Sequence, residues 1–206
     1  MYRSLFKRLI DLLMSITGLI VLFPVILIVA IVMLIANMGN PFFFQERPGK
    51  NEKVFKLIKF RSMTNKKDKD GKLLPDEERL TKFGNFIRKA SLDELPQLLN
   101  VIKGDMSVVG PRPLRVHYLP YYTKRESMRH TVRPGITGLA QVSGRNEVGW
   151  DEKLEFDAKY VDNITLLNDI SIIYKTFLKV IKPSDVIMDD SMQTFDEYRS
   201  QQLEQK

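Results

Sequence analysis

The chain has 206 residues and a formal net charge of +7, with 32 lysines and arginines against 25 acidic residues. It contains no cysteine, which excludes disulfides, zinc–thiolate sites and thiol nucleophiles. Its two histidines, His117 and His130, lack ligand spacing, so a bound metal should be a hard, oxygen-ligated ion such as Mg2+. The basic excess suits anionic lipid, nucleotide phosphates or nucleic acid as partners.

The first predicted element is an uncharged segment of twenty-five residues, 12–36, with Pro24 at its centre. A straight helix of that length would reach about 37 Å, enough to cross a hydrocarbon core of about 30 Å. Basic residues flank both ends, however, and they prefer the cytoplasmic side of a membrane. We therefore predict a re-entrant membrane helix broken at Pro24, whose two arms enter and leave one leaflet. A tilted single span remains the alternative, because proline can merely kink a spanning helix.

Three regions follow from this anchor. Residues 1–40 are predicted to form the re-entrant anchor, in which Lys7 and Asp11, four apart, can pair near the interface. The apolar run is too long for the core of a cleaved signal peptide, and no A-x-A site follows it. Residues 41–183 suit one small cytoplasmic domain at the membrane surface, and the polar tail 184–206 is expected to be mobile.

The predicted domain is α+β and mainly α-helical. Residues 42–45 and 54–63 read as strands of a short β-hairpin, joined by a turn at 47–51. Helical patterning is expected over the ranges 83–103, 150–160 and 169–182. The last helix carries an apolar stripe that suits either a core or a membrane-facing surface. The glycine- and proline-rich region 105–149 is long enough to indicate a functional loop.

An acidic pair, Asp93 and Glu94, is the first candidate for chemistry. Ser91 and Glu94 fit a capping box, whereas Pro96 would move the helix start closer to Asp93. Either assignment places both carboxylates at a helix N-terminus, which favours negative charge and bound phosphate. A carboxylate can also attack phosphorus and form an acyl phosphate. Acidic residues are nevertheless ordinary in a first helical turn.

Arginines on stiff backbone could neutralise a diphosphate beside that pair. Arg112 lies between two prolines, Arg133 and Arg145 lie in glycine-rich turns, and Arg88 precedes Asp93 by five residues. A surface ion pair is the ordinary alternative for each arginine. Two further residues also have open roles. Asp157 could orient an arginine, help to hold a metal or form a plain ion pair, and Trp150 suits the membrane interface and the core equally.

Six motifs then match one family. They are Lys59-Phe60-Arg61-Ser62-Met63, Ser91-Leu92-Asp93-Glu94-Leu95-Pro96-Gln97, Gly104-Asp105-Met106-Ser107, Gly110-Pro111-Arg112-Pro113, Arg133-Pro134-Gly135-Ile136-Thr137-Gly138 and Gly144-Arg145-Asn146. In this order and spacing the chain resembles the small monotopic phosphoglycosyl transferases, a bacterial sugar transferase family, from Tyr2 to about Lys182. Bacillosamine-phosphate transferases are among the members that it resembles in length and pattern.

The resemblance implies an enzyme on the bacterial inner membrane whose catalytic domain faces the cytoplasm. Such enzymes move a sugar phosphate from a UDP-sugar, here expected to be an N-acetylated amino sugar, to a polyprenyl phosphate such as undecaprenyl phosphate. UMP is released, and downstream glycosyltransferases extend the product. By the same resemblance, Asp93 attacks the β-phosphate and forms a covalent intermediate, while Mg2+ sits against Asp93 and Glu94. The residues matching other active-site positions, expected to bind phosphate or nucleotide, are Lys59, Arg88, Arg112, Arg145 and Asp157.

One position departs from the family pattern, and one other class of function fits the composition. Relatives often carry a small hydroxyl residue before the helix-breaking proline, where this chain has Phe23. The alternative function is a membrane-anchored module that binds anionic lipid or nucleic acid without catalysis. It predicts salt-sensitive binding with no dependence on metal. The long glycine- and proline-rich region and the lack of a continuous basic helix argue against it, and no nucleic-acid partner is expected.

Overall fold

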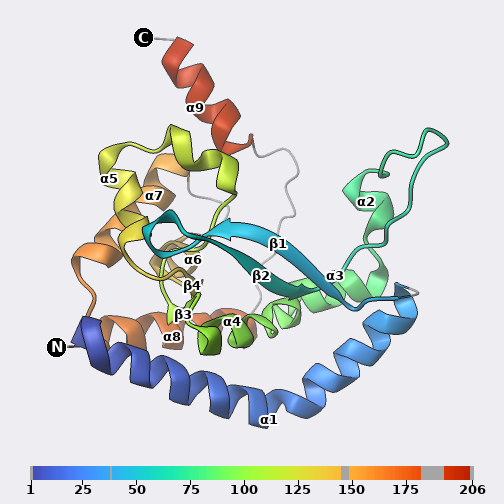
Figure 1. The fold of residues 1–206 in the computed structure, drawn as a ribbon, viewed down its shortest axis with the longest axis horizontal. Coiled ribbons are helices and arrows are strands. Elements are labelled where there is room, and N and C mark those ends of the chain that lie inside the picture. Colours follow the sequence, from blue (N-terminus) through green and yellow to red (C-terminus); the bar gives the residue numbers. More distant parts are fainter. Residues whose placement is uncertain (1, 38, 145–148, 182–192, 205–206) are drawn as a thin grey trace.

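The computed structural model of the chain describes residues 2–37, 39–144, 149–181 and 193–204 (Figure 1). Its α-helices are α1 (Lys7–Ala36), α2 (Asp76–Arg79), α3 (Lys82–Lys89), α4 (Gln97–Lys103), α5 (Lys124–Ser127), α6 (Leu139–Ser143), α7 (Trp150–Asp162), α8 (Leu166–Ile181) and α9 (Phe195–Glu204). Its strands are β1 (Phe42–Pro48), β2 (Val54–Phe60), β3 (Ser107–Val109) and β4 (Gly135–Thr137). The predicted α+β, mainly helical fold is therefore confirmed.

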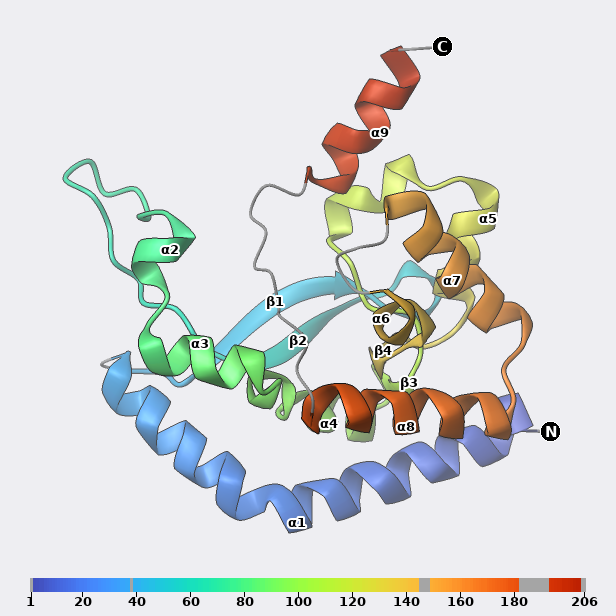
Figure 2. The ribbon, with the colours of Figure 1, turned by 180° about the vertical axis from the view of Figure 1, so that it is seen from behind.

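Helix α1 runs along one edge of the molecule and bends near its middle (Figures 1 and 2). It is one continuous helix of 30 residues, with Pro24 inside it. Pro24 has no N–H to donate to the preceding turn, which is a sufficient cause for a bend. Among the described residues, α1 is the one helix long and apolar enough to cross a membrane. The sequence thus located the apolar helix and its bend, whereas re-entry into one leaflet stays a prediction.

The predicted pair between Lys7 and Asp11 is wrong. Lys7 Nζ instead lies 2.7 Å from the carboxylate of Asp169 on α8. Asp11 is buried and accepts a hydrogen bond of 2.9 Å from the backbone N–H of Val108 in β3. A pair four residues apart on a helix contributes only about 0.2–0.5 kcal/mol, so these tertiary partners prevail. Both contacts fix the first turns of α1 against the domain.

The predicted β-hairpin is confirmed. Strands β1 and β2 pair antiparallel, from Phe42 opposite Phe60 to Pro48 opposite Val54. The buried Asn100 of α4 joins the hairpin to the helix: its Oδ1 accepts from Ile58 N–H at 3.0 Å, and its Nδ2 donates to Lys56 carbonyl at 2.8 Å. These bonds satisfy backbone groups of an edge strand that would otherwise lack partners. They fix the position of Lys59 relative to α4.

The predicted helix 83–103 is interrupted. Helix α3 ends at Lys89, a 3-10 turn covers Leu92–Glu94, and α4 begins only at Gln97. Ser91 adopts a left-handed conformation, with φ of 55°, which ends the first helix. Pro96 occupies the position before α4, as expected for a residue that cannot donate an N–H within a helix. The acidic pair therefore lies in a short turn between two helices.

The helices expected over 150–160 and 169–182 are confirmed as α7 and α8. Most of the expected stripe on α8 is not a core surface, since Ile170, Phe177 and Ile181 are all more than half exposed. The buried residues of α8 are Asp169 and Ile172. Trp150 belongs to the core, in a cluster with Tyr118 and Phe195. Pro183 and the start of the tail lie outside the described residues.

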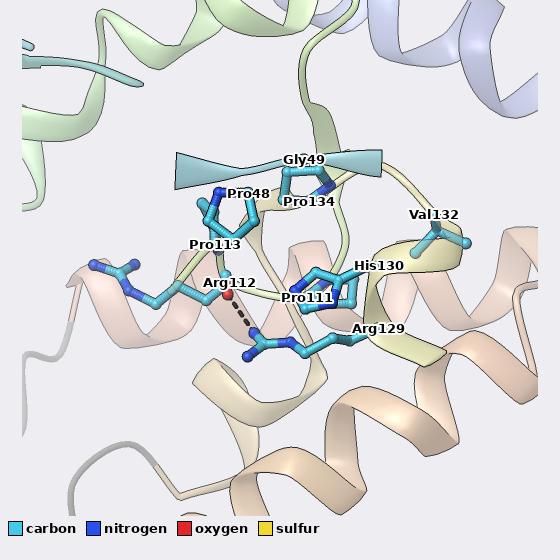
Figure 3. Close-up of a pocket in the computed structure, with 9 residues that line it drawn as sticks. All are labelled: Pro48, Gly49, Pro111, Arg112, Pro113, Arg129, His130, Val132 and Pro134. Atoms are coloured by element: carbon cyan, nitrogen blue, oxygen red, sulfur yellow. Dashed lines mark hydrogen bonds between the residues drawn. The ribbon is translucent and has the colours of Figure 1, made fainter. Parts of the chain in front are cut away.

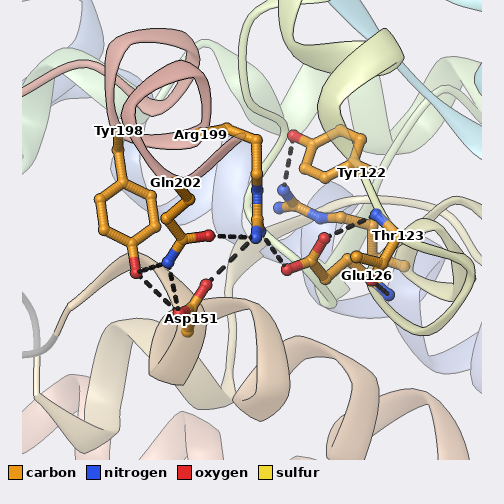
Figure 4. Close-up of polar contacts among 8 residues, drawn as sticks. Tyr122, Thr123, Glu126, Asp151, Tyr198, Arg199 and Gln202 are labelled. Carbon is orange, nitrogen blue, oxygen red and sulfur yellow. Dashed lines mark hydrogen bonds and ion pairs between the residues drawn. The ribbon is translucent and has the colours of Figure 1, made fainter. Parts of the chain in front are cut away.

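The expectation of a mobile tail is wrong for residues 195–204, which form α9. Phe195 is fully buried and stacks on Tyr122 with ring centroids 5.1 Å apart. Arg199 of α9 contacts Glu126 at 2.5 Å and Asp151 at 3.4 Å (Figure 4). One buried aromatic ring and this charged network attach the helix to the domain. The sequence did not predict this attachment because the tail is mostly polar and Phe195 is its one buried aromatic residue among those described.

We expect Phe195→Ala to detach α9. Truncation of a buried phenylalanine costs about 3–5 kcal/mol, and a terminal helix can open by itself without global unfolding. Hydrogen exchange of the α9 amides should then accelerate roughly 100-fold, at 1.4 kcal/mol per factor of ten. Gln201→Ala, at an exposed position of the same helix, is the control. Unchanged exchange in Phe195→Ala would show that the ring does not hold the helix.

Candidate active site

The acidic pair lies at the junction of β2, α3 and α4. Asp93 and Glu94 occupy the 3-10 turn Leu92–Glu94, directly before Pro96 and α4. The predicted placement near a helix start is confirmed, but the capping box is not, because the Ser91 side chain makes no capping hydrogen bond. Both carboxylates are largely shielded from solvent: Asp93 is 8% exposed, and the Glu94 side chain is 14% exposed.

Glu94 is held between two cations. Its Oε1 lies 2.7 Å from Lys59 Nζ and 2.8 Å from Arg112 Nη2. Burial by itself would raise the pKa of Glu94, but the charges of Arg112 and Lys59 outweigh it and lower the pKa to about 2. The same contact raises the pKa of Arg112. Glu94 is thus a permanently ionised residue that fixes the positions of Lys59 and Arg112, two of the predicted phosphate-binding residues.

Asp93 has the opposite electrostatic environment. Burial raises its pKa to about 6, the charge of Glu94 adds to the shift, and Lys59, Arg112 and Arg88 oppose it. Within the described part of the chain, no hydrogen bond or ion pair to the Asp93 carboxylate is found. Two adjacent carboxylates therefore have pKa values on opposite sides of the ordinary range. Such a split is typical of sites where two acidic groups have different roles.

The backbone of Arg112 is held by a buried ion pair between Arg129 and Asp157. Arg129 Nη2 donates to the carbonyl of Arg112 (Figure 3). The same nitrogen lies 2.9 Å from Asp157. The side chains of Arg129 and Asp157 are 2% and 5% exposed. Burial nevertheless raises the pKa of Asp157 to about 6, with the charge of Arg129 opposing the shift. Asp157 therefore forms an ion pair with Arg129, which in turn donates to the backbone of Arg112, and its predicted roles at the site stay predictions.

A second group of arginines adjoins Arg112. Burial, and then the charges of Arg112 and Arg115, lower the pKa of Arg47 to about 10. Arg47 donates to Gln45 at 2.6 Å, a neutral partner that leaves this repulsion uncompensated. The sequence analysis assigned Arg47 only to a turn, and Arg129 had no role at all. Both lie far from the acidic pair along the chain, so only the hairpin and the loop 110–133 bring them close.

The other predicted site residues are distributed unevenly. The charge of Arg88 reaches Asp93, as its influence on that pKa shows, and its Nη2 lies 3.8 Å from Met63 Sδ. Arg133 does not join the acidic pair: its Nε donates to the Gly104 carbonyl at 2.8 Å, at the far end of α4. Arg145 lies outside the described residues.

Comparison with known proteins agrees with this geometry. A model of the family described as "Bacterial sugar transferase" matches residues 2–183. The chain belongs to the bacterial sugar transferase family. This transferase is 52% identical over 181 residues to "Uncharacterized sugar transferase EpsL" of Bacillus subtilis, covering 85% of the chain and 87% of that relative.

Two other relatives have names that state a reaction. "Undecaprenyl-phosphate galactose phosphotransferase" of Salmonella typhimurium is 42% identical over 195 residues, or 85% of the transferase and 40% of the relative. "UDP-glucose:undecaprenyl-phosphate glucose-1-phosphate transferase" of Klebsiella pneumoniae is 41% identical over 184 residues, or 84% and 40%. The transferase thus spans about two fifths of the length of these two proteins. Their names state galactose and glucose, and the predicted likeness to bacillosamine-phosphate transferases stays a prediction.

The acidic pair of the transferase also suits a magnesium ion. Among the described residues, no cluster of three or more histidine or acidic side chains could hold a metal by itself. Mg2+ commonly binds through one or two carboxylates and completes its shell with water and substrate phosphates. Asp93, which is buried and makes no ion pair among the described residues, and Glu94 beside it fit that mode. The residues present are therefore compatible with a magnesium ion that arrives with a diphosphate.

Proposed function

We propose that the protein transfers a sugar phosphate from a UDP-sugar to a membrane polyprenyl phosphate, undecaprenyl phosphate, and releases UMP. The observation that carries the proposal is a buried Asp93 with no hydrogen bond or ion pair among the described residues, beside cations that Glu94 holds in place. Family membership and the names of the Salmonella and Klebsiella relatives support the reaction class. The cluster of Arg47, Arg112 and Arg115, whose mutual repulsion helps to lower the pKa of Arg47, favours a polyanionic donor.

The transfer proceeds in two steps in this proposal. An Asp93 oxygen attacks the β-phosphorus of the donor; the bond from that phosphorus to the bridging oxygen breaks, and UMP leaves with the electron pair. An oxygen of the acceptor phosphate then attacks the same phosphorus and releases the Asp93 carboxylate. Lys59 and Arg112 stabilise negative charge on the phosphoryl oxygens. Glu94 keeps these two cations oriented, and Arg129 with Asp157 fixes the backbone of Arg112.

Mg2+ completes the proposed site, held by Asp93 and Glu94. When bound, it would neutralise the diphosphate and assist departure of UMP. The donor sugar is the least constrained part of the proposal. An N-acetylated amino sugar is the expectation from resemblance, whereas the names of two relatives state galactose and glucose. A screen of UMP release should therefore include UDP-N-acetylglucosamine, UDP-galactose and UDP-glucose.

The test of the covalent step is intact-protein mass spectrometry after incubation with donor and Mg2+ but no acceptor. A phosphosugar adduct on the wild-type protein, absent from Asp93→Asn, is the expected result. Formation of product without any adduct would overturn the two-step route. The alternative function, a binding module without catalysis, predicts no UMP release with any donor. The same assay therefore distinguishes the two functions.

We also propose that α1 enters and leaves one leaflet on the cytoplasmic side. The bend at Pro24, the basic flanks of the apolar segment and the exposed apolar face of α8 favour this arrangement. Arg3→Cys and Asn40→Cys should then both be labelled only from the cytoplasmic side of sealed vesicles. Labelling from opposite sides would establish a single span instead.

A further inference from the structure

A second cavity lies away from the proposed transfer site. It has a volume of about 290 Å3, is open to solvent on one side and is lined by the first turns of α1, strand β3 and the 3-10 turn Met128–Thr131. Arg8 of this cavity donates to the carbonyls of Val101 and Ile102, at the C-terminal end of α4. The acidic pair precedes the opposite end of that helix, which is about 10 Å long. The cavity is therefore separate from Asp93 and Glu94.

The cavity is rich in positive charge. Arg3, Lys7, Arg8, Lys50 and Arg133 line it, together with one carboxylate, Asp11. Three of the cations are held in place: Arg8 and Arg133 donate to carbonyls near the end of α4, and Lys7 pairs with Asp169. Arg3 and Lys50 are exposed, and within the described chain they make no side-chain hydrogen bond or ion pair. The inner cations are thus preorganised, and the outer two are available to a ligand.

The positive charges of Arg8 and Arg133 repel each other inside this cavity. Burial and the nearby charge of Arg133 lower the pKa of Arg8, and only Asp11 opposes them. Asp11 is already engaged with Val108 N–H, and the Lys7 charge is matched by Asp169. An anion between the guanidinium groups of Arg8 and Arg133 would relieve their repulsion. The cavity volume of about 290 Å3 lies at the lower end of the roughly 300–1,000 Å3 of small-molecule sites, which is room enough for a compact anionic group.

The depth of the cavity relative to lipid follows from the two faces of α1. Leu5, Leu9 and Leu13 are 68%, 54% and 59% exposed, on the surface away from the domain. Lys7 and Asp11 face the domain and line the cavity. A helix with this pattern lies at the boundary of headgroups and acyl chains, with its apolar side toward the lipid. The N-terminal part of α1 lies beside α8 (Figures 1 and 2), and in this orientation the cavity's cations would lie at the level of the lipid phosphates.

We propose that this cavity binds the phosphate headgroup of an anionic membrane phospholipid and so fixes the height of the domain on the membrane. Arg8 and Arg133 contact the phosphate, and Arg3 and Lys50 close over it from the exposed side. The proposal needs α1 to lie in the membrane, but it does not need Asp93 to be the nucleophile. If Asp93 were shown not to be the nucleophile, the lipid-binding proposal would still stand, and the reverse also holds.

The test uses the full chain in a neutral detergent. Binding of dihexanoyl-phosphatidylglycerol, dihexanoyl-phosphatidylcholine and inorganic phosphate is measured by native mass spectrometry and by the shift in Tm. Arg3→Gln/Lys50→Gln removes two charges without breaking the hydrogen bonds that hold α1. Lys69→Gln/Lys72→Gln, in the exposed loop before α2, makes the same charge change elsewhere. We expect the anionic lipid to bind in preference to the other two, and the first variant to weaken it roughly tenfold.

Three outcomes would overturn the proposal. The first is equal binding of the two lipids, and the second is equal loss in the two double variants. The third is inorganic phosphate binding as tightly as the anionic lipid, which would show a free-anion site. The KM for polyprenyl phosphate provides a further check and should not change in Arg3→Gln/Lys50→Gln. A rise in that KM parallel to the loss of lipid would assign the cavity to the acceptor instead.

Discussion

Asp93→Asn is expected to abolish turnover and to stabilise the folded protein at the same time. The amide has nearly the shape of the carboxylate but cannot attack phosphorus, so UMP release should fall at least about 10³-fold. The stability gain follows from the raised pKa. Folding raises the pKa of the Asp93 carboxyl from 3.8 to about 6, so its ionised form destabilises the folded state. After allowance for partial solvation, this destabilisation is about 2 kcal/mol. Thermal unfolding and UMP release at pH 7.5 measure both effects.

The pH dependence of these effects has a definite sign. Because the folded pKa of Asp93 is the higher one, the folded state binds the proton more tightly, and the penalty is complete only above about pH 6. The difference in Tm between Asp93→Asn and wild type should shrink as the pH falls from 6 toward 4. Wild-type turnover should fall over the range in which Asp93 gains its proton. Asp162→Asn is the control, since that carboxylate pairs with Arg125 on an exposed surface. A lower Tm for Asp93→Asn at pH 7.5 would contradict the electrostatic assignment.

Local sequence signals were sufficient for the regular elements and for the acidic pair. The uncharged run around Pro24 identified α1, two short strands joined by a turn identified the hairpin, and helical spacing identified α7 and α8. The position of Asp93 and Glu94 near the start of a helix could be predicted, because it depends on residues close to them in the sequence, such as Pro96. The break at Ser91 had no such signal, because serine rarely adopts the left-handed conformation that it has here.

Tertiary contacts account for what the sequence could not show. Asp157 was predicted at the site, but its role depends on Arg129, which folding brings between it and Arg112. Arg133 resembled the other arginines in turns, yet its turn faces the opposite end of α4. Lys7 was predicted to pair with Asp11, four residues away, but in the structure it pairs with Asp169, which is 162 residues away in the sequence. In each case the partner of the side chain is set by the fold and not by its neighbours in the chain.

Glu94→Gln should lower the stability that Asp93→Asn raises, although each variant removes one negative charge from adjacent residues. Glu94 has a pKa lowered to about 2 from 4.5, so its ionised form stabilises the fold above about pH 4.5. That contribution is lost as the pH falls toward 2. The amide would leave Lys59 and Arg112 without their counter-charge. We expect a loss of about 2 kcal/mol at pH 7.5, reduced from the full shift because the Arg112 side chain is 43% exposed.

Activity should fall with that stability, by roughly 100-fold, because Lys59 and Arg112 would no longer be fixed toward the transferred phosphate. The opposite stability changes of the two amide variants make each the matched control of the other. Chemical denaturation at pH 7.5 gives both free energies, and UMP release gives both rates. If Glu94→Gln were as stable as Asp93→Asn, the cations would not depend on Glu94 for their position. Full turnover in Glu94→Gln would show that Glu94 has no role in catalysis, and that the bound diphosphate orients Lys59 and Arg112 by itself.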